Sequence, residues 1–270
     1  MEWADIIREL AGDALRKVAP LLPKPPDNLP RTGEEAKDRS EKIDRVCEHA
    51  ILEGLKSRGI ACVVVSEDIG TVRVGGGSSY HVVVDPVDGT TNASRGIPYS
   101  AISIAVSENS WMSGVFTGIV VNVYTGEVFT ATRGQGAYRN GTPIRASSVK
   151  ELKNAVVSVD LSKYGKSTEW IRKIAPKVSA IRSFGSASIE LSYVAMGLTD
   201  AHADLRWMIR PVDVAAGILV LEEAGGAVYT RSRYGEKVPL KPKEPIIVVG
   251  AANRELLNKI LEIIGVPPPP

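Results

Sequence analysis

Cysteine, histidine and long apolar runs are scarce in this sequence. Its two cysteines, Cys47 and Cys62, fall in a helical and a strand pattern, so we expect buried free thiols. No segment approaches the roughly 18 apolar residues that a membrane span needs, and the first residues, MEWADIIREL, lack the apolar core of a signal peptide. These absences predict a cytoplasmic protein.

An excess of charge of one sign is also missing. The 33 Lys and Arg residues nearly balance the 31 Asp and Glu residues, which leaves a net charge of +2. This balance argues against nucleic acid or a membrane surface as a partner. The three histidines, His49, His81 and His202, stand in no recognisable motif, so we expect structural roles for them.

The N-terminal part combines two helical patterns with a proline-rich break. Apolar residues recur at helical spacing over 2–19, and again along a second helix that ends near Gly59. Residues 20–33 contain five prolines, which predicts an extended loop. That loop is either a plain connector or a lid that brings Lys24, Arg31 or Glu34 to a site.

The rest of the chain predicts strands first and then an alternation of strands and helices. The expected strands are 60–66, 80–84, 100–107, 115–123, 126–132, 155–160, 226–230 and 246–250, and the expected helices are 167–178, 187–197, 213–224 and 253–264, the last with Asn253 as N-cap. An α+β half therefore precedes an α/β half. We expect two tightly packed lobes, residues 1–148 and 149–270.

The strongest chemical signal is Asp85-Pro86-Val87-Asp88-Gly89-Thr90-Thr91-Asn92, which follows the apolar strand YHVVV. Two carboxylates at the mouth of a buried strand are costly unless a cation neutralises them. The residues after Gly89 suit the start of a helix, whose free N–H groups and dipole favour phosphate. Mg²⁺ prefers carboxylates together with phosphate oxygens. Alone, DPVDG is also typical of a solvated turn.

Three further acids are candidates, each with an ordinary alternative. Asp213 opens a helix of small apolar residues, where it is either a plain N-cap or a carboxylate that close helix packing brings into a site. Glu67 ends the strand 60–66, and by itself it reads as a surface acid. Asp44 is one of several charges on the second helix.

Together these residues resemble the inositol monophosphatase and fructose-1,6-bisphosphatase superfamily, in particular its archaeal dual-activity type. DPVDGTTN is similar to the signature D-P-[IVL]-D-G-[TS]-x-N. PVDVAAG with the later EEAGG is similar to the signature W-D-x-A-x-G…EAGG, although Val212 replaces the Trp. The similarity covers about residues 1–264. It implies a layered αβαβα sandwich and a hydrolase of phosphate monoesters.

The resemblance also implies the metal ligands. Glu67, Asp85 and the carbonyl of Val87 would hold one Mg²⁺, and Asp85, Asp88 and Asp213 a second. A third, weaker ion would use Glu67, and Mn²⁺ is expected to substitute. Two such ions lower the pKa of an attacking water and stabilise the leaving alkoxide, for a reaction that is extremely slow without a catalyst.

The resemblance assigns catalysis and phosphate binding to nearby residues. Thr90 with Asp44 would orient and deprotonate the attacking water, and Glu67 belongs to the same catalytic group. The N–H groups of Gly89 and Thr90, beside Asp88, would bind phosphate oxygens.

Arg206 is the position most informative about the substrate. Inositol-specific members carry a glutamate there, whereas an arginine only donates hydrogen bonds and favours anions. We therefore expect a substrate with a second anionic group, such as fructose 1,6-bisphosphate, alongside inositol 1-phosphate. The ordinary alternative is an ion pair of Arg206 with Asp204 or Glu223.

Gly185, Ser186 and Arg182 are further candidates for the sugar side of the site. A phosphatase of 3′-phosphoadenosine 5′-phosphate or NADP is an alternative function, with Trp207 as the platform for a base. A non-catalytic regulatory protein of the same fold is another, which the small net charge disfavours. A homodimer is expected from the resemblance.

Overall fold

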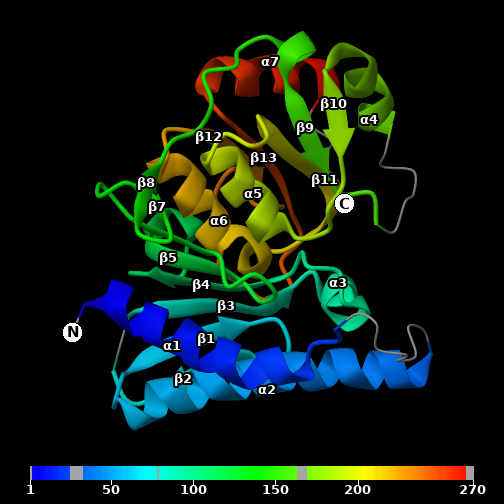
Figure 1. Cartoon of the computed structure of the whole chain (residues 1–270). Helices are drawn as coiled ribbons and strands as arrows, with labels where there is room; N and C mark the ends of the chain where they lie inside the picture. The colour runs from blue at the N-terminus through cyan, green and yellow to red at the C-terminus, as the bar shows by residue number, and fades with distance from the viewer. Residues whose placement is uncertain (1, 25–32, 78, 163–168, 266–270) are drawn as a thin grey trace.

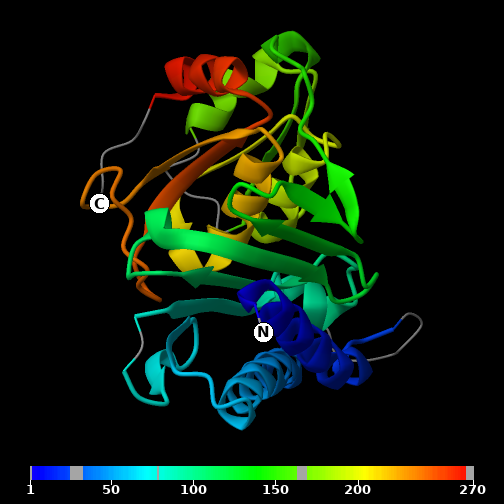
Figure 2. The ribbon, with the colours of Figure 1, turned by 90° about the vertical axis from the view of Figure 1, so that its left-hand side faces the viewer.

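The computed structural model describes residues 2–24, 33–77, 79–162 and 169–265. Helices and strands stack in five layers in the order α-β-α-β-α, which confirms the expected sandwich (Figure 1). The view turned by 90° separates the same layers, with α1 and α2 at one end and α7 at the other (Figure 2).

The helices form three layers. One outer layer is the pair α1 and α2, the inner layer is α5 with α6, and the other outer layer is α4 with α7. The short helix α3 follows β3 at the edge of the first sheet and packs near α2. The helices span Trp3–Val18 (α1), Glu34–Ser57 (α2), Thr90–Arg95 (α3), Glu169–Ile174 (α4), Ala187–Ala195 (α5), Pro211–Glu223 (α6) and Arg254–Ile264 (α7).

The first sheet has eight strands in the order β2-β1-β3-β4-β5-β6-β7-β8. Neighbours are antiparallel except β1 and β3, which run parallel with Ser66 opposite Val84. The residues that come next, Glu67 and Asp85, therefore lie at the same edge. The strands span Cys62–Ser66 (β1), Gly70–Val74 (β2), His81–Asp88 (β3), Ala101–Ser107 (β4), Val115–Asn122 (β5), Val128–Thr132 (β6), Ala137–Arg139 (β7) and Thr142–Ile144 (β8).

The second sheet has five strands in the order β10-β9-β11-β13-β12. Strands β10, β9 and β11 are parallel, and β13 is antiparallel to both β11 and β12. The register of β11 with β13 shifts between Asp204 and Ile209. The strands span Val156–Val159 (β9), Ala180–Arg182 (β10), Ala201–Ile209 (β11), Ala227–Arg231 (β12) and Ile246–Ala251 (β13).

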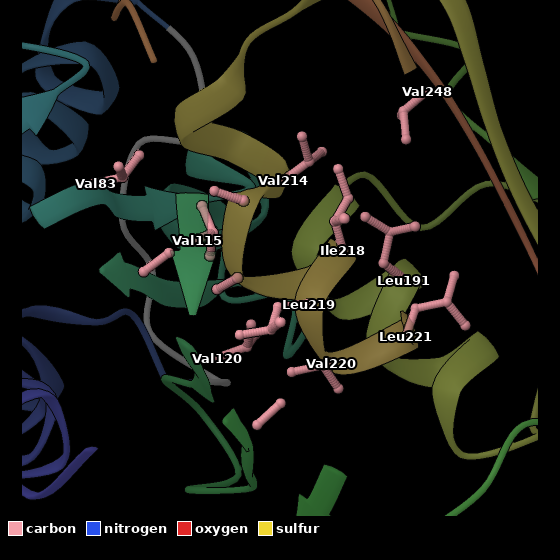
Figure 3. Close-up of a cluster of buried hydrophobic side chains, with 14 of the residues drawn as sticks. Val83, Val115, Val120, Leu191, Val214, Ile218, Leu219, Val220, Leu221 and Val248 are labelled. Carbon is pink, nitrogen blue, oxygen red and sulfur yellow. The ribbon is translucent and has the colours of Figure 1, made fainter. Parts of the chain in front are cut away.

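Three clusters of buried apolar side chains fill the four spaces between the five layers, and the central cluster, which covers both faces of the inner helical layer, positions the site. Helix α6 runs through this central cluster and is buried from Pro211 to Leu221 (Figure 3). Its small residues allow a close approach to α5, because a Cβ on Gly217 would lie 3.1 Å from both the Leu191 Cβ and the Ser188 carbonyl oxygen. The start of α6 is thereby held rigidly between the two sheets.

Most predicted elements are confirmed, with small differences at their ends. Asn253 caps α7, because its Oδ1 accepts the Leu256 N–H at 3.0 Å, and both cysteines are buried and free. The predicted loop over 20–33 differs at its start, where 19–21 form a 3₁₀ turn, and its residues 25–32 lie outside the described part. The first two residues of the predicted helix 167–178 also lie outside it, and 175–177 continue α4 as a 3₁₀ turn.

The sequence analysis missed β2, β7, β8, β10 and β11. Four of them are short or lie at a sheet edge, where the apolar pattern is weak. The predicted boundary at 148/149 falls between the last strand of the first sheet and the first strand of the second. The division into two lobes stays a prediction. In the described part of the chain, no helix combines the length and apolar character that crossing a membrane requires.

Candidate active site

A cavity of about 580 Å³ opens where the first sheet meets the starts of α3, α5 and α6. Its walls combine acidic groups, two arginines and a glycine-containing turn. It is lined by Glu67, Asp85, Val87, Asp88, Gly89, Thr90, Thr91, Asn92, Asp160, Ser162, Gly185, Ala187, Asp204, Arg206, Met208, Ile209, Arg210 and Asp213. Most of the predicted site residues therefore meet in one place.

Strand β3 carries two of the carboxylates, Asp85 and Asp88. Its register with β4 shifts between Asp85 and Asp88, as expected for a strand interrupted by Pro86. The Asp85 side chain is nearly inaccessible, and its Oδ1 accepts the N–H of Val87 at 3.1 Å. This bond holds the carboxylate against its own turn.

The turn after β3 requires glycine. Gly89 has a φ of 86°, and a Cβ there would lie 2.9 Å from the Gly185 carbonyl oxygen. The Thr90 hydroxyl donates to the Val87 carbonyl at 3.1 Å, so two predicted site groups contact each other. The Asn92 amide donates to the Tyr99 and Phe184 carbonyls at 2.8 and 2.7 Å. These bonds tie α3 to the loop that precedes α5.

Glu67, Asp85 and Asp213 form a cluster with the donor set of a divalent cation. One carboxylate oxygen from each lies within 4.8 Å of the other two. Hard oxygen ligands at this spacing suit Mg²⁺ or Mn²⁺. Glu67 directly follows β1, Asp85 lies on β3 and Asp213 lies on α6, so the three groups come from distant parts of the sequence.

Arg210 contacts this cluster, and the sequence analysis did not identify it. Its guanidinium forms an ion pair with Glu67 and another with Asp213 Oδ1, the latter at 2.9 Å. Its backbone N–H also donates to Asp213 Oδ2 at 2.8 Å, which caps the start of α6. The overlooked signal is the pair Arg210-Pro211, which predicts that α6 begins there. The N-cap of a helix lies close to the third helical residue, which here is Asp213.

Burial and mutual repulsion make the carboxylates of the site weak acids when no cation is bound. Burial, followed by the charges of Asp88 and Asp213, raises the pKa of Asp85 well above its ordinary value. Burial also raises the pKa of Asp88 to about 7, although hydrogen bonds from Ser188 lower it. The pKa of Asp44 is raised to about 8 by burial and then by Asp68 and Glu67. A divalent cation would relieve this repulsion.

Asp88 is held by the start of α5. Its Oδ2 accepts hydrogen bonds from the Ser186 hydroxyl, the Ser188 N–H and the Ser188 hydroxyl at 2.8, 2.7 and 2.6 Å. Ser186 is buried and reaches the site through Asp88 rather than by lining the cavity. Ser188 is a supporting residue that the sequence analysis missed.

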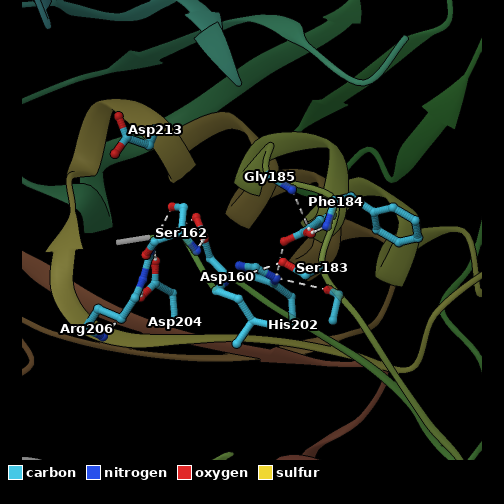
Figure 4. A network of polar contacts seen from close by, with 12 residues as sticks. Asp160, Ser162, Ser183, Phe184, Gly185, His202, Asp204, Arg206 and Asp213 are labelled. Carbon is cyan, nitrogen blue, oxygen red and sulfur yellow. Dashed lines mark hydrogen bonds and ion pairs between the residues drawn. The ribbon is translucent and has the colours of Figure 1, made fainter. Parts of the chain in front are cut away.

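The turn that carries Gly185 rests on a buried ion pair. Glu190 Oε1 accepts the N–H groups of Phe184 and Gly185 at 2.8 and 3.3 Å. Its Oε2 lies 2.7 Å from His202 Nδ1, which also lies 3.0 Å from the Ser158 hydroxyl (Figure 4). His202 therefore has a structural role, as expected, and this role is to fix the wall of the cavity.

Arg206 forms an ion pair with Asp204. The sequence analysis gave this ion pair as the ordinary alternative to a role in substrate binding. Its Nη2 lies 2.6 Å from Asp204 and 2.7 Å from Asp160, and its Nη1 donates to Ser162 (Figure 4). Glu223 instead accepts the N–H groups of Gly134 and Gly136. Arg206 still lines the cavity, with Asp160 as a neighbour that the sequence analysis missed.

Besides Ser186, three further residues considered from the sequence lie outside the cavity wall. Asp44 is close enough to Glu67 and Asp68 to feel their charges, but it does not line the cavity. Arg182 is exposed on β10, where its Nη1 donates to the carbonyl of Ile181. Trp207 packs against the apolar cluster beneath α7 and does not face the cavity.

The chain matches known proteins along almost its whole length. Residues 2–265 match the model of the inositol monophosphatase family. The fructose-1,6-bisphosphatase/inositol-1-monophosphatase of Methanothermobacter thermautotrophicus is 34% identical, over 98% of this chain and 97% of the relative. The enzyme of the same name from Thermococcus kodakarensis is 35% identical over 96% of both chains.

Solved structures and other relatives extend this comparison. A Pyrococcus horikoshii protein described as similar to inositol-1 monophosphatase superimposes with a TM-score of 0.77, at 32% identity over 97% of both chains. A bifunctional NADP phosphatase/NAD kinase of Methanococcus maripaludis is 28% identical over 98% of this chain and half of its own length. The Nus factor SuhB of Pseudomonas aeruginosa is 33% identical over 72% of this chain and 73% of its own.

The raised pKa values predict how pH acts on the metal-free protein. The pKa values of Asp88 and Asp44 are about 7 and about 8 in the folded chain, against an ordinary value of 3.8. The folded state then binds more protons than the unfolded state over this interval, so stability falls as the pH rises through it. Urea unfolding in EDTA should give a lower free energy at about pH 8 than at about pH 6.

Saturating Mn²⁺ should flatten this dependence, because the cation replaces the protons. A metal-free protein that is equally stable at both pH values would contradict the raised pKa values.

Proposed function

This chain belongs to the inositol monophosphatase family, and from that premise we propose that it is a Mg²⁺-dependent phosphomonoesterase acting on a small phosphorylated sugar or polyol. The observation that carries the proposal is the convergence of Glu67, Asp85 and Asp213 beside the Gly89-Thr90 turn. A cation site and a phosphate site thereby share one cavity. This is the arrangement that phosphoryl transfer to water requires.

Each residue has a role in this reaction. Divalent cations held by the cluster would activate water and neutralise the charge of the phosphoryl group. We assign their binding to Glu67, Asp85, the Val87 carbonyl and Asp213, with Asp88 as a further ligand. The hydrogen bonds of Asp88 to the start of α5 fix its position before any ligand binds.

Asp44 and Thr90 are the residues assigned to the attacking water. The Asp44 carboxylate is partly buried and close enough to Glu67 to be affected by its charge, and we assign it as the base that takes a proton from the water. The Thr90 hydroxyl donates to the Val87 carbonyl, which leaves its oxygen as an acceptor for the water. The N–H groups of Gly89 and Thr90 would bind phosphate oxygens.

We propose fructose 1,6-bisphosphate and inositol 1-phosphate as substrates, following the names of the two archaeal relatives. Both present a phosphate monoester on a ring rich in hydroxyl groups, and the wall formed by Gly185, Ser162 and Asp204 is polar. A nucleotide phosphatase is less favoured, because Trp207, the aromatic platform expected for a base, packs away from the cavity. A cytoplasmic homodimer remains our prediction for the working form.

The first test is phosphate release from a panel of substrates. Fructose 1,6-bisphosphate, inositol 1-phosphate, NADP and 3′-phosphoadenosine 5′-phosphate are each assayed with Mg²⁺ and with EDTA. Asp85→Asn should reduce release by at least about 100-fold, since it removes a ligand that we place at both cations. Asp5→Asn, on the exposed face of α1, is the matched control and should retain wild-type activity. Activity that survives EDTA, or an active Asp85→Asn variant, would refute the proposal.

The second test concerns the choice of substrate. Arg206 contacts Asp160, whose side chain is 21% exposed, and we propose that a second anionic group of the substrate replaces this contact. Arg206→Ala should then lower kcat/KM for the bisphosphate roughly tenfold more than for inositol 1-phosphate. Arg206→Lys, which keeps a cation beside buried Asp204, should recover part of the difference.

A thermal melt of both variants controls for folding, because Arg206 also neutralises Asp204. An equal loss on both substrates, or no loss, would show that Arg206 has no part in selectivity.

A further inference from the structure

Arg210 is a cation that the chain itself supplies to the carboxylate cluster. Its guanidinium makes an ion pair with Glu67, contacts Asp213 Oδ1 at 2.9 Å through Nη2, and contacts Asp213 Oδ2 at 3.2 Å through Nε. Although burial lowers it, these carboxylates raise the pKa of Arg210 above its ordinary value. Two of the three clustered carboxylates are therefore neutralised in part by a fixed positive charge.

These contacts compete with a divalent cation. Glu67 and Asp213 are two of the three groups whose oxygens lie within 4.8 Å of one another. A divalent cation held there would use oxygen ligands from both groups and would bring two positive charges. The guanidinium cannot keep its hydrogen bonds to the same oxygens, and it is also repelled by the ion.

The position of Arg210 allows its guanidinium to move away from Glu67 and Asp213. Its side chain is 28% exposed, at the edge of the cavity, so the guanidinium can rotate toward solvent. Arg206, four residues earlier, is only 6% exposed and is held by Asp204 and Asp160, which are not in the metal cluster. The backbone bond from the Arg210 N–H to Asp213 Oδ2 does not depend on the side chain and keeps the start of α6 in place.

We propose that Arg210 is a displaceable internal cation that neutralises Glu67 and Asp213 in the metal-free protein and sets the concentration of divalent metal at which the site fills. The proposal rests on the metal dependence proposed above. Binding of the ion releases the guanidinium, so part of the free energy of metal binding is used to break these ion pairs. Metal affinity is consequently lower than the carboxylates alone would give.

The test is calorimetric titration of the purified full chain with Mn²⁺ alone. Arg210→Gln should bind Mn²⁺ about tenfold more tightly than the wild type. In EDTA the same variant should melt at a lower temperature than the wild type, and this difference should shrink when Mn²⁺ is saturating. Arg210→Lys keeps the charge but loses the two-pronged geometry, so it should tighten binding by a smaller factor.

Arg182→Gln is the matched control, because it removes the same charge from an exposed position outside the cavity. Its Mn²⁺ affinity should stay within about twofold of the wild type, since exposed charges are screened. If Arg210→Gln and Arg210→Lys bind Mn²⁺ no more tightly than the wild type, the inference is wrong and the proposed function stands. If the wild type binds no Mn²⁺, both are wrong.

Discussion

The structure of the site depends on holding several carboxylates together in a place where water has little access. Removing one carboxylate from water is costly, and bringing like charges within a few ångströms adds repulsion. Asp85 is 3% exposed, and after burial itself the charges of Asp88 and Asp213 are the ones that raise its pKa most. Without a cation, two effects reduce this free-energy cost. Carboxylates of the cluster take up protons, and the Arg210 guanidinium forms ion pairs with them.

The layered fold supplies the rigidity that this arrangement needs. Parallel pairing of β1 with β3 puts Glu67 beside Asp85, and helix α6 brings Asp213 from the space between the sheets. Helix α6 is buried along most of its length, so its N-terminus cannot move away from the cluster without disrupting the central core. Repulsion among the acids is thus opposed by the packing of a whole layer in addition to the local ion pairs of Arg210.

A second set of buried polar contacts shapes the opposite wall. Glu190 and His202 fix the turn that carries Gly185, and Asp88 is fixed by the start of the same helix, α5. The backbone of Gly185, which lines the cavity, and the carboxylate of Asp88 are therefore both positioned by one helix. Preorganisation of this kind lowers the cost of orienting a substrate, because little has to move when it binds.

The sequence was sufficient to predict the layers and the acids but not their supports. Long elements with strong periodicity, such as α1, α7 and β3, are visible in the chain, and DPVDGTTN marks the site by its own chemistry. Strand β11 was missed because it contains the polar residues His202, Asp204 and Arg206, which pair with Glu190, with each other and with Asp160. Arg210 was missed because its role depends on contact with Glu67, which follows β1 and lies far from it in the sequence.

The most direct measurement is anomalous diffraction from crystals soaked in Mn²⁺. The account predicts an anomalous peak bounded by carboxylate oxygens of Glu67, Asp85 and Asp213, with the Arg210 guanidinium no longer in contact with Glu67. Crystals that hold Mn²⁺ elsewhere and leave this cluster bound to Arg210 would contradict the central claim that these acids form a metal-dependent phosphatase site.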